Sequence, residues 1–530
     1  MSKVIIDWDS KYKKAQIISD SLDIIRHHFS VPNSAASILR RRHGQGARIA
    51  QRFYAITEGG RFEIGLLVEV LQYLRSAAYD FDIILTPLLE DQISVVDSES
   101  FKLPTLSMAP RDFQVTGVEK GLKVGRGVFI VGTGGGKTYL MALIDRAFKQ
   151  RSDHTTTLIA LPAQLVRQTS NDLIEYGISA DEISIWSEGS SLELKPIIIA
   201  SYTTIQSQTT SFKRLKKRNA KKNESQDEYT VYTDNFEKTE KERLKDWKRR
   251  KKRIVELLQQ IDLVIFDEVH SIRQNNKINK LFDMLHTRHL FGLTGTMPDN
   301  KVDCWNIIGK IGPVLDEVTA FDLETRGYVA KAVARIIQIN HTYPIEVVAD
   351  FNNPTKAYME ECEWLFTNTF RNSVISKLCG KLPNNTLIVV DKLLHGDTLY
   401  DTLSKELTNK QVYWIRGETA SDEREFVRAE METNSNIVCI AMSKIFSTGT
   451  NIKNIHYVMF AQGGKAKIRV IQSIGRGRRL HSDKNELVIL DITDNTKYSL
   501  DALAERLLRY QEEQISYEIK QIYEETFNKG

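Results

Sequence analysis

The sequence predicts an α/β protein with two parallel-sheet domains in tandem, a small N-terminal α+β module and a C-terminal helical tail. Apolar, strand-like runs alternate with helical patterns along most of the chain, which is typical of parallel sheets. One run of glycines directly follows such a strand and leads into a helix, and no second run of this kind occurs. We place the module at residues 1–108, the two sheet domains at 109–318 and 319–496, and the tail at 497–530.

Composition is that of an ordinary globular protein, with 530 residues, 41% of them hydrophobic and 27% charged, and a net charge of +5. The four cysteines lie far apart without C-x-x-C spacing, which argues against a zinc site or a disulfide framework and favours a reducing compartment. The sequence shows no signal peptide and no apolar run long enough to span a bilayer. We expect an intracellular, cytoplasmic protein that makes no membrane contact.

Short elements predict the α+β character of the N-terminal module. We expect strands at 3–7 and 82–85, helices at 21–29 and 66–74, and a hairpin with strands 52–56 and 61–65. Between these elements, Arg40, Arg41 and Arg42 stand next to glycines. Such a loop suits contact with a nucleic-acid backbone, and a solvated loop is the alternative.

The stretch after the apolar strand at 128–131 has the composition of a phosphate-binding loop. Its residues are Gly132, Thr133, Gly134, Gly135, Gly136, Lys137 and Thr138. Glycines let backbone N–H groups surround an anion, and the following helix adds a favourable dipole. Lys137 would reach the β and γ phosphates, and the Thr138 hydroxyl would hold Mg²⁺. The stretch predicts ATP and Mg²⁺ as cofactors, although Val131 replaces the usual first glycine and a plain glycine-rich turn is the alternative.

Two further sites in the first sheet domain suit a nucleotide. Asp267 and Glu268 end an apolar strand, where Asp267 would hold Mg²⁺ and Glu268 would activate the attacking water. Upstream of the glycine loop, Arg111 and Gln114 form a segment whose glutamine can hydrogen-bond both edges of adenine. The strand at 291–296 ends in hydroxyl side chains that could couple the acidic pair to domain movement.

Other strand ends in the first sheet domain carry polar residues. The strand at 157–161 leads to Pro162 and Gln168, and the strand at 197–200 leads into Ser201 and a helix. The carboxyl ends of parallel strands bind ligands, so these residues suit nucleic-acid phosphates, with plain helix capping as the alternative.

An insert at 211–260 is dense in lysine and arginine. We expect its middle, 223–234, to be mobile and its second half to be a charged helix. Such a run usually forms a solvated face, but contact with DNA is the interpretation we favour, because each neutralised phosphate releases counterions.

The second sheet domain is expected to supply cationic side chains. We expect its strands at 387–390, 412–415, 437–441 and 456–460. Arg476 and Arg479 lie three apart on one helical face, so both could point at a γ-phosphate and stabilise the transition state. Gln472 and Gly475 at fixed offsets argue against a helix end that merely faces water.

Together, five motifs over residues 111–494 resemble superfamily 2 helicases: G-T-G-G-G-K-T, D-E-V-H, T-G-T, S-T-G-T-N and Q-S-I-G-R-G-R-R. More narrowly, the stretches 445–449, 453–456 and 464–467 resemble the phage UvsW-type recombination helicases. The resemblance implies two RecA-like motor domains and 3′-to-5′ remodelling of branched or forked DNA by branch migration, fork regression, and D-loop or R-loop unwinding. It also implies a monomer, in the host cytoplasm if phage-encoded, with RNA–DNA hybrids among its substrates.

The resemblance also assigns residues. It implies catalytic roles for Lys137, Asp267, Glu268, Gln472, Arg476 and Arg479, a nucleotide contact for Gly449, and nucleic-acid contacts for Thr204, Lys392, His395, Arg416 and Thr448. Val131, Ala163 and the basic insert depart from the family's pattern. An RNA helicase and an ATP-switched DNA-annealing protein remain alternatives. In the tail, Leu503, Leu507, Leu508 and Tyr510 predict a helical stripe that packs on the motor.

Overall fold

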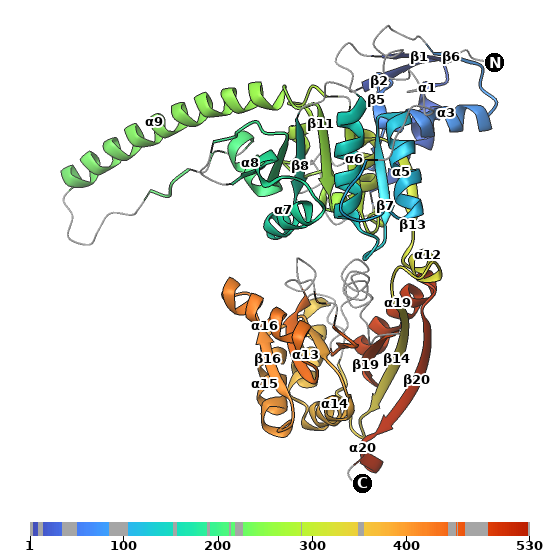
Figure 1. Ribbon diagram of the computed structural model, residues 1–530, viewed down its shortest axis with the longest axis vertical. Coiled ribbons are helices and arrows are strands. Elements are labelled where there is room, and N and C mark those ends of the chain that lie inside the picture. The colour runs from blue at the N-terminus through green and yellow to red at the C-terminus, as the bar shows by residue number, and fades with distance from the viewer. Residues whose placement is uncertain are drawn as a thin grey trace. The chain divides into compact units, whose positions relative to one another are not determined.

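The structure is a computed structural model, and it describes most of the chain in two compact units. The described residues are 4–8, 14–33, 36, 50–83, 104–151, 156–187, 191–210, 212, 214–217, 226–287, 289–347, 354–443, 452, 454–461 and 486–527. One unit comprises Met1–Ile130 with Lys137–Glu317, and the other comprises Val131–Gly136 with Val318–Gly530 (Figure 1). Among the described helices, none has both the length and the apolar composition that crossing a bilayer requires.

The N-terminal module combines a four-stranded sheet, in the order β5-β2-β1-β6, with a separate β3-β4 pair and two helices. Its elements are β1 (Val4–Trp8), β2 (Lys14–Ile18), α1 (Leu22–His28), β3 (Ser30–Pro32), β4 (Arg52–Tyr54), β5 (Arg61–Glu63), α3 (Leu67–Ser76) and β6 (Phe81–Ile83). The two predicted helices are confirmed, but the predicted hairpin is wrong. β4 pairs with β3 and β5 pairs with β2, because each strand finds a partner earlier in the chain.

The module shares its hydrophobic core with α11 (Lys301–Ile311) of the neighbouring sheet domain. Trp305 and Ile308 of that helix belong to the same buried cluster as the module's own apolar residues. The contact is close at Gly65, where an added Cβ would lie 1.8 Å from the carbonyl oxygen of Ile308. Lys310 also pairs with Glu63 at 3.2 Å. The module is therefore packed rigidly on α11.

The first large sheet has seven strands in the order β13-β7-β12-β11-β8-β10-β9. They are β7 (Arg126–Val131), β8 (Thr157–Leu161), β9 (Ile183–Trp186), β10 (Ile197–Ser201), β11 (Leu263–Asp267), β12 (His289–Thr294) and β13 (Val314–Val318). The neighbouring strands from β7 to β9 pair in parallel. The central strands are buried along their whole length, which explains why the sequence shows them as continuous apolar runs.

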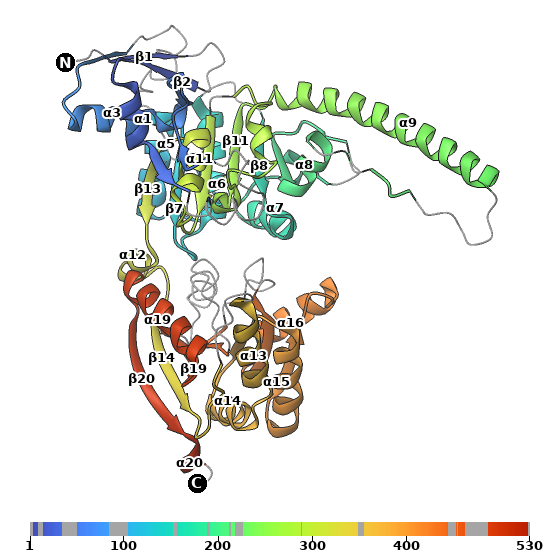
Figure 2. The ribbon, with the colours of Figure 1, turned by 180° about the vertical axis from the view of Figure 1, so that it is seen from behind.

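Helices cover this sheet, and one of them extends well beyond it. They are α5 (Asp112–Val124), α6 (Lys137–Arg151), α7 (Val166–Glu175), α8 (Tyr202–Thr209), α9 (Gln226–Leu258), α10 (Asn279–Phe282) and α11. Both ribbon views show α9 projecting from the sheet as a long single helix (Figures 1 and 2). Residues 226–234, part of the segment predicted to be mobile, form the first turns of α9.

The second large sheet also has seven strands, in the order β16-β17-β15-β18-β19-β14-β20, and every pair is parallel. They are β14 (Lys331–Asn340), β15 (Thr386–Val390), β16 (Gln411–Ile415), β17 (Ile437–Met442), β18 (Tyr457–Phe460), β19 (Glu486–Asp494) and β20 (Ser516–Tyr523). The accompanying helices are α12 (Ala320–Thr325), α13 (Pro354–Thr367), α14 (Thr369–Lys381), α15 (Leu393–Glu406), α16 (Ser421–Thr433), α19 (Lys497–Glu512) and α20 (Glu524–Phe527). The prediction of two tandem parallel sheets is confirmed.

The C-terminal tail is only partly helical. The predicted helix ends at Glu512, and the residues of β20 then pair in parallel with β14 as an edge strand. Leu503 and Tyr510 of the predicted stripe are buried and Leu507 packs against the same core, whereas Leu508 is 55% exposed. The prediction of a continuous helix failed because β20 is an exposed edge strand, whose weak apolar alternation becomes a strand only through pairing.

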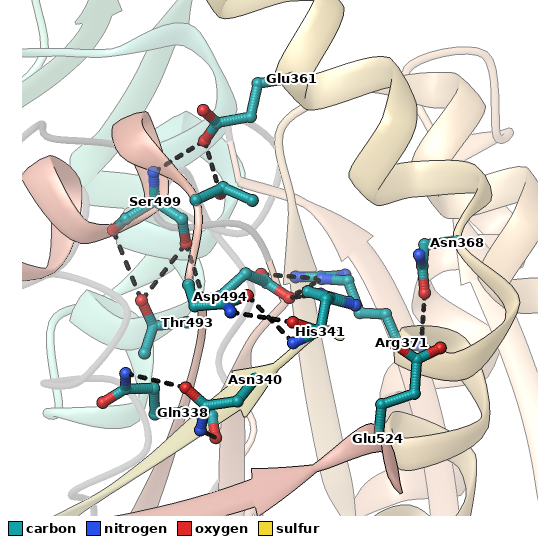
Figure 3. A network of polar contacts seen from close by, with 12 residues as sticks. Gln338, Asn340, His341, Glu361, Asn368, Arg371, Thr493, Asp494, Ser499 and Glu524 are labelled. Carbon is teal, nitrogen blue, oxygen red and sulfur yellow. Dashed lines mark hydrogen bonds and ion pairs between the residues drawn. The ribbon is translucent and has the colours of Figure 1, made fainter. Parts of the chain in front are cut away.

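A buried polar network ties the helices of the second unit to the end of β19 (Figure 3). Asp494 accepts from the Arg371 guanidinium at 3.0 Å and lies 2.9 Å from His341 Nε2. Glu361 accepts from the backbone N–H of Ser499 at 2.9 Å, which holds the start of α19. Burial raises the pKa of Asp494, but the Arg371 charge and the bonds to Arg371 and His341 outweigh it and hold that pKa below its usual value. The network therefore stabilises the unit at neutral pH and is lost only as the pH falls below about 4.

Replacing Gly65 by alanine should separate the module from α11. The added methyl group meets a backbone carbonyl that cannot turn aside, so we expect a loss of about 3 kcal/mol in the free energy of unfolding and faster proteolysis within residues 1–108. Gly59→Ala is the matched control, because nothing lies within 4 Å of its added Cβ. Equal unfolding midpoints for the two variants would contradict the close contact.

Replacing Arg371 by methionine should destabilise the second unit strongly. The Asp494 carboxylate would remain buried without its main cation, so we expect a loss of about 3–5 kcal/mol in urea unfolding at pH 7. Arg428→Met is the control, because Arg428 pairs with Glu425 on the exposed surface of α16, and its loss should stay below about 1 kcal/mol. Similar losses for both variants would refute the role of the network.

Candidate nucleotide and nucleic-acid site

The glycine loop leaves β7 at Val131 and enters α6 at Lys137. Gly134 and Gly136 have φ values of 89° and 77°, a conformation that side chains with a Cβ rarely adopt. A Cβ on Gly135 would lie 2.4 Å from Val131 Cγ1. The loop is therefore a tight turn that needs glycine, and its shape fits the phosphate cradle that the sequence predicts.

The loop is also held from outside its own strand and helix. The N–H of Gly132 donates to the carbonyl of Val318 at 2.9 Å. Added Cβ atoms on Gly134 and Gly135 would lie 2.8 Å from Val329 and 3.2 Å from Leu323. The segment around α12 thus packs against the loop and fixes its path.

The acidic pair ends β11, the central buried strand of the first sheet. Asp267 is 5% exposed, and its Oδ1 accepts the backbone N–H of Glu268 at 2.9 Å. The Tyr202 hydroxyl donates to the carbonyl oxygen of Asp267. Glu268 has a φ of 52°, an unusual conformation for a residue with a side chain, which costs about 1–3 kcal/mol and is typical of functional sites.

Lys137 and Glu268 face one another in the structure. The lysine Nζ lies 3.9 Å from Glu268 Oε1, and the two side chains are 13% and 16% exposed. The predicted phosphate-binding lysine and the predicted water-activating carboxylate therefore lie together, although they are far apart in the sequence. This is the arrangement that hydrolysis of a bound triphosphate requires.

Burial and charge raise the pKa of Asp267 to about 7. Burial is the largest cause and the negative charge of Glu268 is the next, while Lys137 acts in the opposite direction. Oxygen ligands with this excess of negative charge fit Mg²⁺, which would be held by Asp267 and Thr138 together with the phosphates. Within the described residues there is no cluster of three or more acidic, histidine or cysteine side chains that could hold a metal ion.

His270 is a site residue to which the sequence analysis gave no role, whereas Thr294 is one of the hydroxyl side chains that it expected to couple to the acidic pair. His270 Nδ1 lies 3.2 Å from Glu268 Oε2 and 3.0 Å from the Thr294 hydroxyl. Since Thr294 donates its own proton to the carbonyl of Thr296 at 2.8 Å, His270 Nδ1 must be the donor. The end of β12 thereby holds His270, whose ring lies beside Glu268, as the D-E-V-H and T-G-T motifs could have suggested.

Two predicted contacts are engaged inside the first unit. Gln114 is 2% exposed, and its Oε1 accepts the backbone N–H of Arg111 at 2.9 Å, so it caps α5. Contact with adenine requires its amide to leave this cap. Thr204 is 6% exposed, with its hydroxyl 2.9 Å from Ser201 Oγ, which caps α8. Ser201 thus caps α8, as the alternative interpretation of this strand end expected, and the nucleic-acid contact of Thr204 stays a prediction.

The predicted contacts in the second unit divide into exposed and buried side chains. Lys392 precedes α15 and Arg416 follows β16, both exposed at carboxyl ends of strands. His395 is fully buried, stacked on Phe366 at 4.6 Å, and burial lowers its pKa well below the usual value. The helix turns the His395 ring into the core, and its contact with nucleic acid stays a prediction.

Pro162 and Gln168 are partly exposed at the carboxyl end of β8, so the structure leaves them available for contact. The remaining predicted residues lie outside the described residues: Arg40, Arg41, Arg42, Thr448, Gly449, Gln472, Arg476 and Arg479. Their roles stay predictions.

Comparisons with known proteins agree with the two sheets. The model of the family described as "Type III restriction enzyme, res subunit" matches residues 107–299, and "Helicase conserved C-terminal domain" matches residues 371–481. A fragment of a putative HsdR subunit of a type I restriction enzyme from Vibrio vulnificus shares the fold, with a TM-score of 0.54, 15% identity and coverage of 82% of this chain and 73% of its own. These matches support a helicase of superfamily 2.

Within that class, the chain resembles the phage UvsW helicases. It is 24% identical over 438 residues to "ATP-dependent DNA helicase uvsW" of Enterobacteria phage T4, covering 78% of this chain and 77% of the relative. It is 22% identical over 437 residues to "DNA 3'-5' helicase XPB" of Kineococcus radiotolerans, covering 81% and 68%.

Replacing Thr294 by valine should release His270 from the end of β12. The imidazole N–H would lose an acceptor in a partly buried place, so we expect a loss of about 1–3 kcal/mol in the free energy of unfolding. Thr296→Val is the matched control, because it keeps the backbone carbonyl to which Thr294 donates. Chemical denaturation of both variants measures the difference, and equal stability would contradict the proposed link.

Proposed function

We propose that the chain is an ATP-dependent DNA helicase or translocase that remodels branched DNA. Its actions would be branch migration, fork regression, and D-loop or R-loop unwinding, with 3′-to-5′ movement in phage recombination and replication. It would act as a monomer in the host cytoplasm. The observation that carries the proposal is the approach of Lys137 to Glu268 beside the buried Asp267, at the point where a glycine loop opens α6.

The residues of this site have separate roles in the proposal. The N–H groups of residues 133–136 and the Lys137 ammonium bind the phosphates, and Asp267 and Thr138 hold Mg²⁺, which neutralises phosphate charge when it is bound. Glu268 accepts the proton of the attacking water, and His270 keeps its carboxylate in place. Arg476 and Arg479, with Gln472, are proposed to stabilise the charge that develops in the transition state.

Relatives support DNA as the substrate. Both relatives carry names that specify DNA, and one of the names specifies 3′-to-5′ direction. In this chain, Lys392 and Arg416 are exposed cations at strand ends and suit phosphate contacts. Phosphate contacts carry no base information, so we expect binding that depends on DNA structure rather than on sequence.

Replacing Glu268 by glutamine should stop turnover while ATP and DNA still bind. The amide keeps the shape of the side chain but cannot accept the proton, so we expect kcat for ATP to fall about 10²–10⁴-fold. Glu119→Gln, an exposed residue of α5, is the control and should leave kcat unchanged. Steady-state ATPase and nucleotide binding measure the two effects, and retained turnover in the Glu268 variant would refute the assigned role.

A substrate panel tests what the ATP is used for. We expect forks, four-way junctions, D-loops and R-loops to stimulate ATP hydrolysis and to be unwound, because a motor of this class grips phosphates along one strand. The measurements are ATPase and strand separation at fixed ionic strength. Preference for RNA duplexes would favour an RNA helicase, and strand displacement that persists with a non-hydrolysable ATP analogue would favour an ATP-switched annealing protein.

A further inference from the structure

The C-terminal end of helix α9 is anchored in the core of the first sheet. Ile254 and Leu258, near its C-terminus, are 7% and 0% exposed and belong to the core of the first sheet. The helix has 33 residues, so it is about 50 Å long. Both ribbon views show that most of it projects from the sheet (Figures 1 and 2). The sheet's core therefore accounts for the anchored end of α9 and leaves the projecting part to be explained.

Charge is segregated along α9. Residues 226–240, toward the tip, carry five acidic side chains and one basic one, whereas residues 241–253, toward the sheet, carry nine basic and two acidic ones. A helix that needed only to be solvated would mix the two signs. The run from Lys248 to Arg253 instead places like charges three and four residues apart, which destabilises a helix by about 0.2–0.5 kcal/mol for each pair. We call residues 241–253 the basic band.

The basic band is docked on α8 and is extended by a neighbouring segment. Trp247 Nε1 donates to the carbonyl of Ser207, in α8, at 3.1 Å. The ring of Phe212 lies 5.9 Å from that of Trp247, with the Arg243 guanidinium 5.5 Å above it. Residues 214–217, which follow Phe212, are all exposed and include three cations. Since Phe212 lies beside Trp247 and the Lys217 ammonium lies 5.9 Å from the Tyr229 ring, this segment runs along α9 from the basic band toward the tip and adds positive charge there.

The position of the basic band points to one kind of occupant. Its docking helix α8 begins at the carboxyl end of β10, the edge of the sheet where parallel-sheet proteins bind ligands. The aromatic rings near the band are engaged in packing, so the exposed chemistry is cationic rather than a stacking platform for bases. A straight, rigid line of cations complements duplex DNA best, because a duplex is itself rigid and carries about one charge per 1.7 Å.

We infer that the basic band, together with residues 214–217, binds the phosphate backbone of a duplex arm of the substrate. That this duplex is an arm of the substrate rests on the proposed function. The binding of duplex DNA by the basic band does not depend on it. The insert thereby has the task of holding duplex DNA beside the first sheet. The acidic tip, residues 226–240, is expected to stay out of contact because phosphates repel it.

The test is a triple variant of the full chain, Lys248→Gln, Lys252→Gln and Arg253→Gln. All three side chains are exposed, and glutamine keeps helix propensity close to that of lysine and arginine. We expect affinity for a blunt DNA duplex, measured by fluorescence anisotropy, to fall about 10-fold, and the slope of log Kd against log salt to decrease by about 2 to 3. Affinity for a single strand of equal length should change less than about 2-fold.

A second triple variant with the same change in net charge is the control. Lys356→Gln, Lys381→Gln and Lys405→Gln alter exposed lysines of the other unit and should leave duplex binding unchanged. Unchanged duplex binding in the band variant, an equal loss in the control, or an equal loss for single strands would each overturn the inference. ATP hydrolysis stimulated by a single strand is measured in the same preparations. If a single strand does not stimulate ATP hydrolysis by the unaltered chain, the proposed function is refuted. The duplex affinities of the two variants would still test whether the basic band binds duplex DNA.

Discussion

The interaction on which the site depends is the compensation of two adjacent carboxylates by one lysine. Asp267 and Glu268 end a fully buried strand, where negative charge is costly, and burial with mutual repulsion raises the pKa of Asp267 to about 7. Lys137 offsets part of that cost from 3.9 Å away. The sheet order makes this possible, because β12 alone separates β7, which leads to the lysine, from β11, which carries the pair.

The same site stores strain and is supported by neighbours with structural roles. The left-handed backbone of Glu268 turns its carboxylate toward Lys137 and His270. The backbone at Glu268 and the buried Asp267 both cost stability, and such costs are retained where function needs them. Tyr202 and Thr294 do no chemistry themselves, yet they hold the carbonyl of Asp267 and the ring of His270. The site is therefore positioned by the ends of three strands and not by the motif residues alone.

Different forces hold the periphery of each unit. The N-terminal module depends on apolar packing against α11, with Gly65 allowing the backbones to approach. The second unit depends on buried ion pairs, since Asp491 accepts from Arg506 and Tyr510 just as Asp494 accepts from Arg371. Cys362, Cys379 and Cys439 are buried and pack as small apolar residues. Among the described helices and strands, α9 alone projects far from the hydrophobic cores of the two units.

The sequence by itself determined the two parallel sheets, because buried strands appear as continuous apolar runs, and it determined the glycine loop and acidic pair, because their chemistry depends on residue type and spacing. It misjudged the hairpin at residues 52–65 and the strand β20, whose partners lie far away along the chain. It did not reveal that the Thr204 and His395 side chains are buried, since position in a motif does not reveal which way a helix turns a side chain. Only the tertiary structure decided those orientations and brought His270 to Glu268, because burial and long-range pairing are properties of the packed chain.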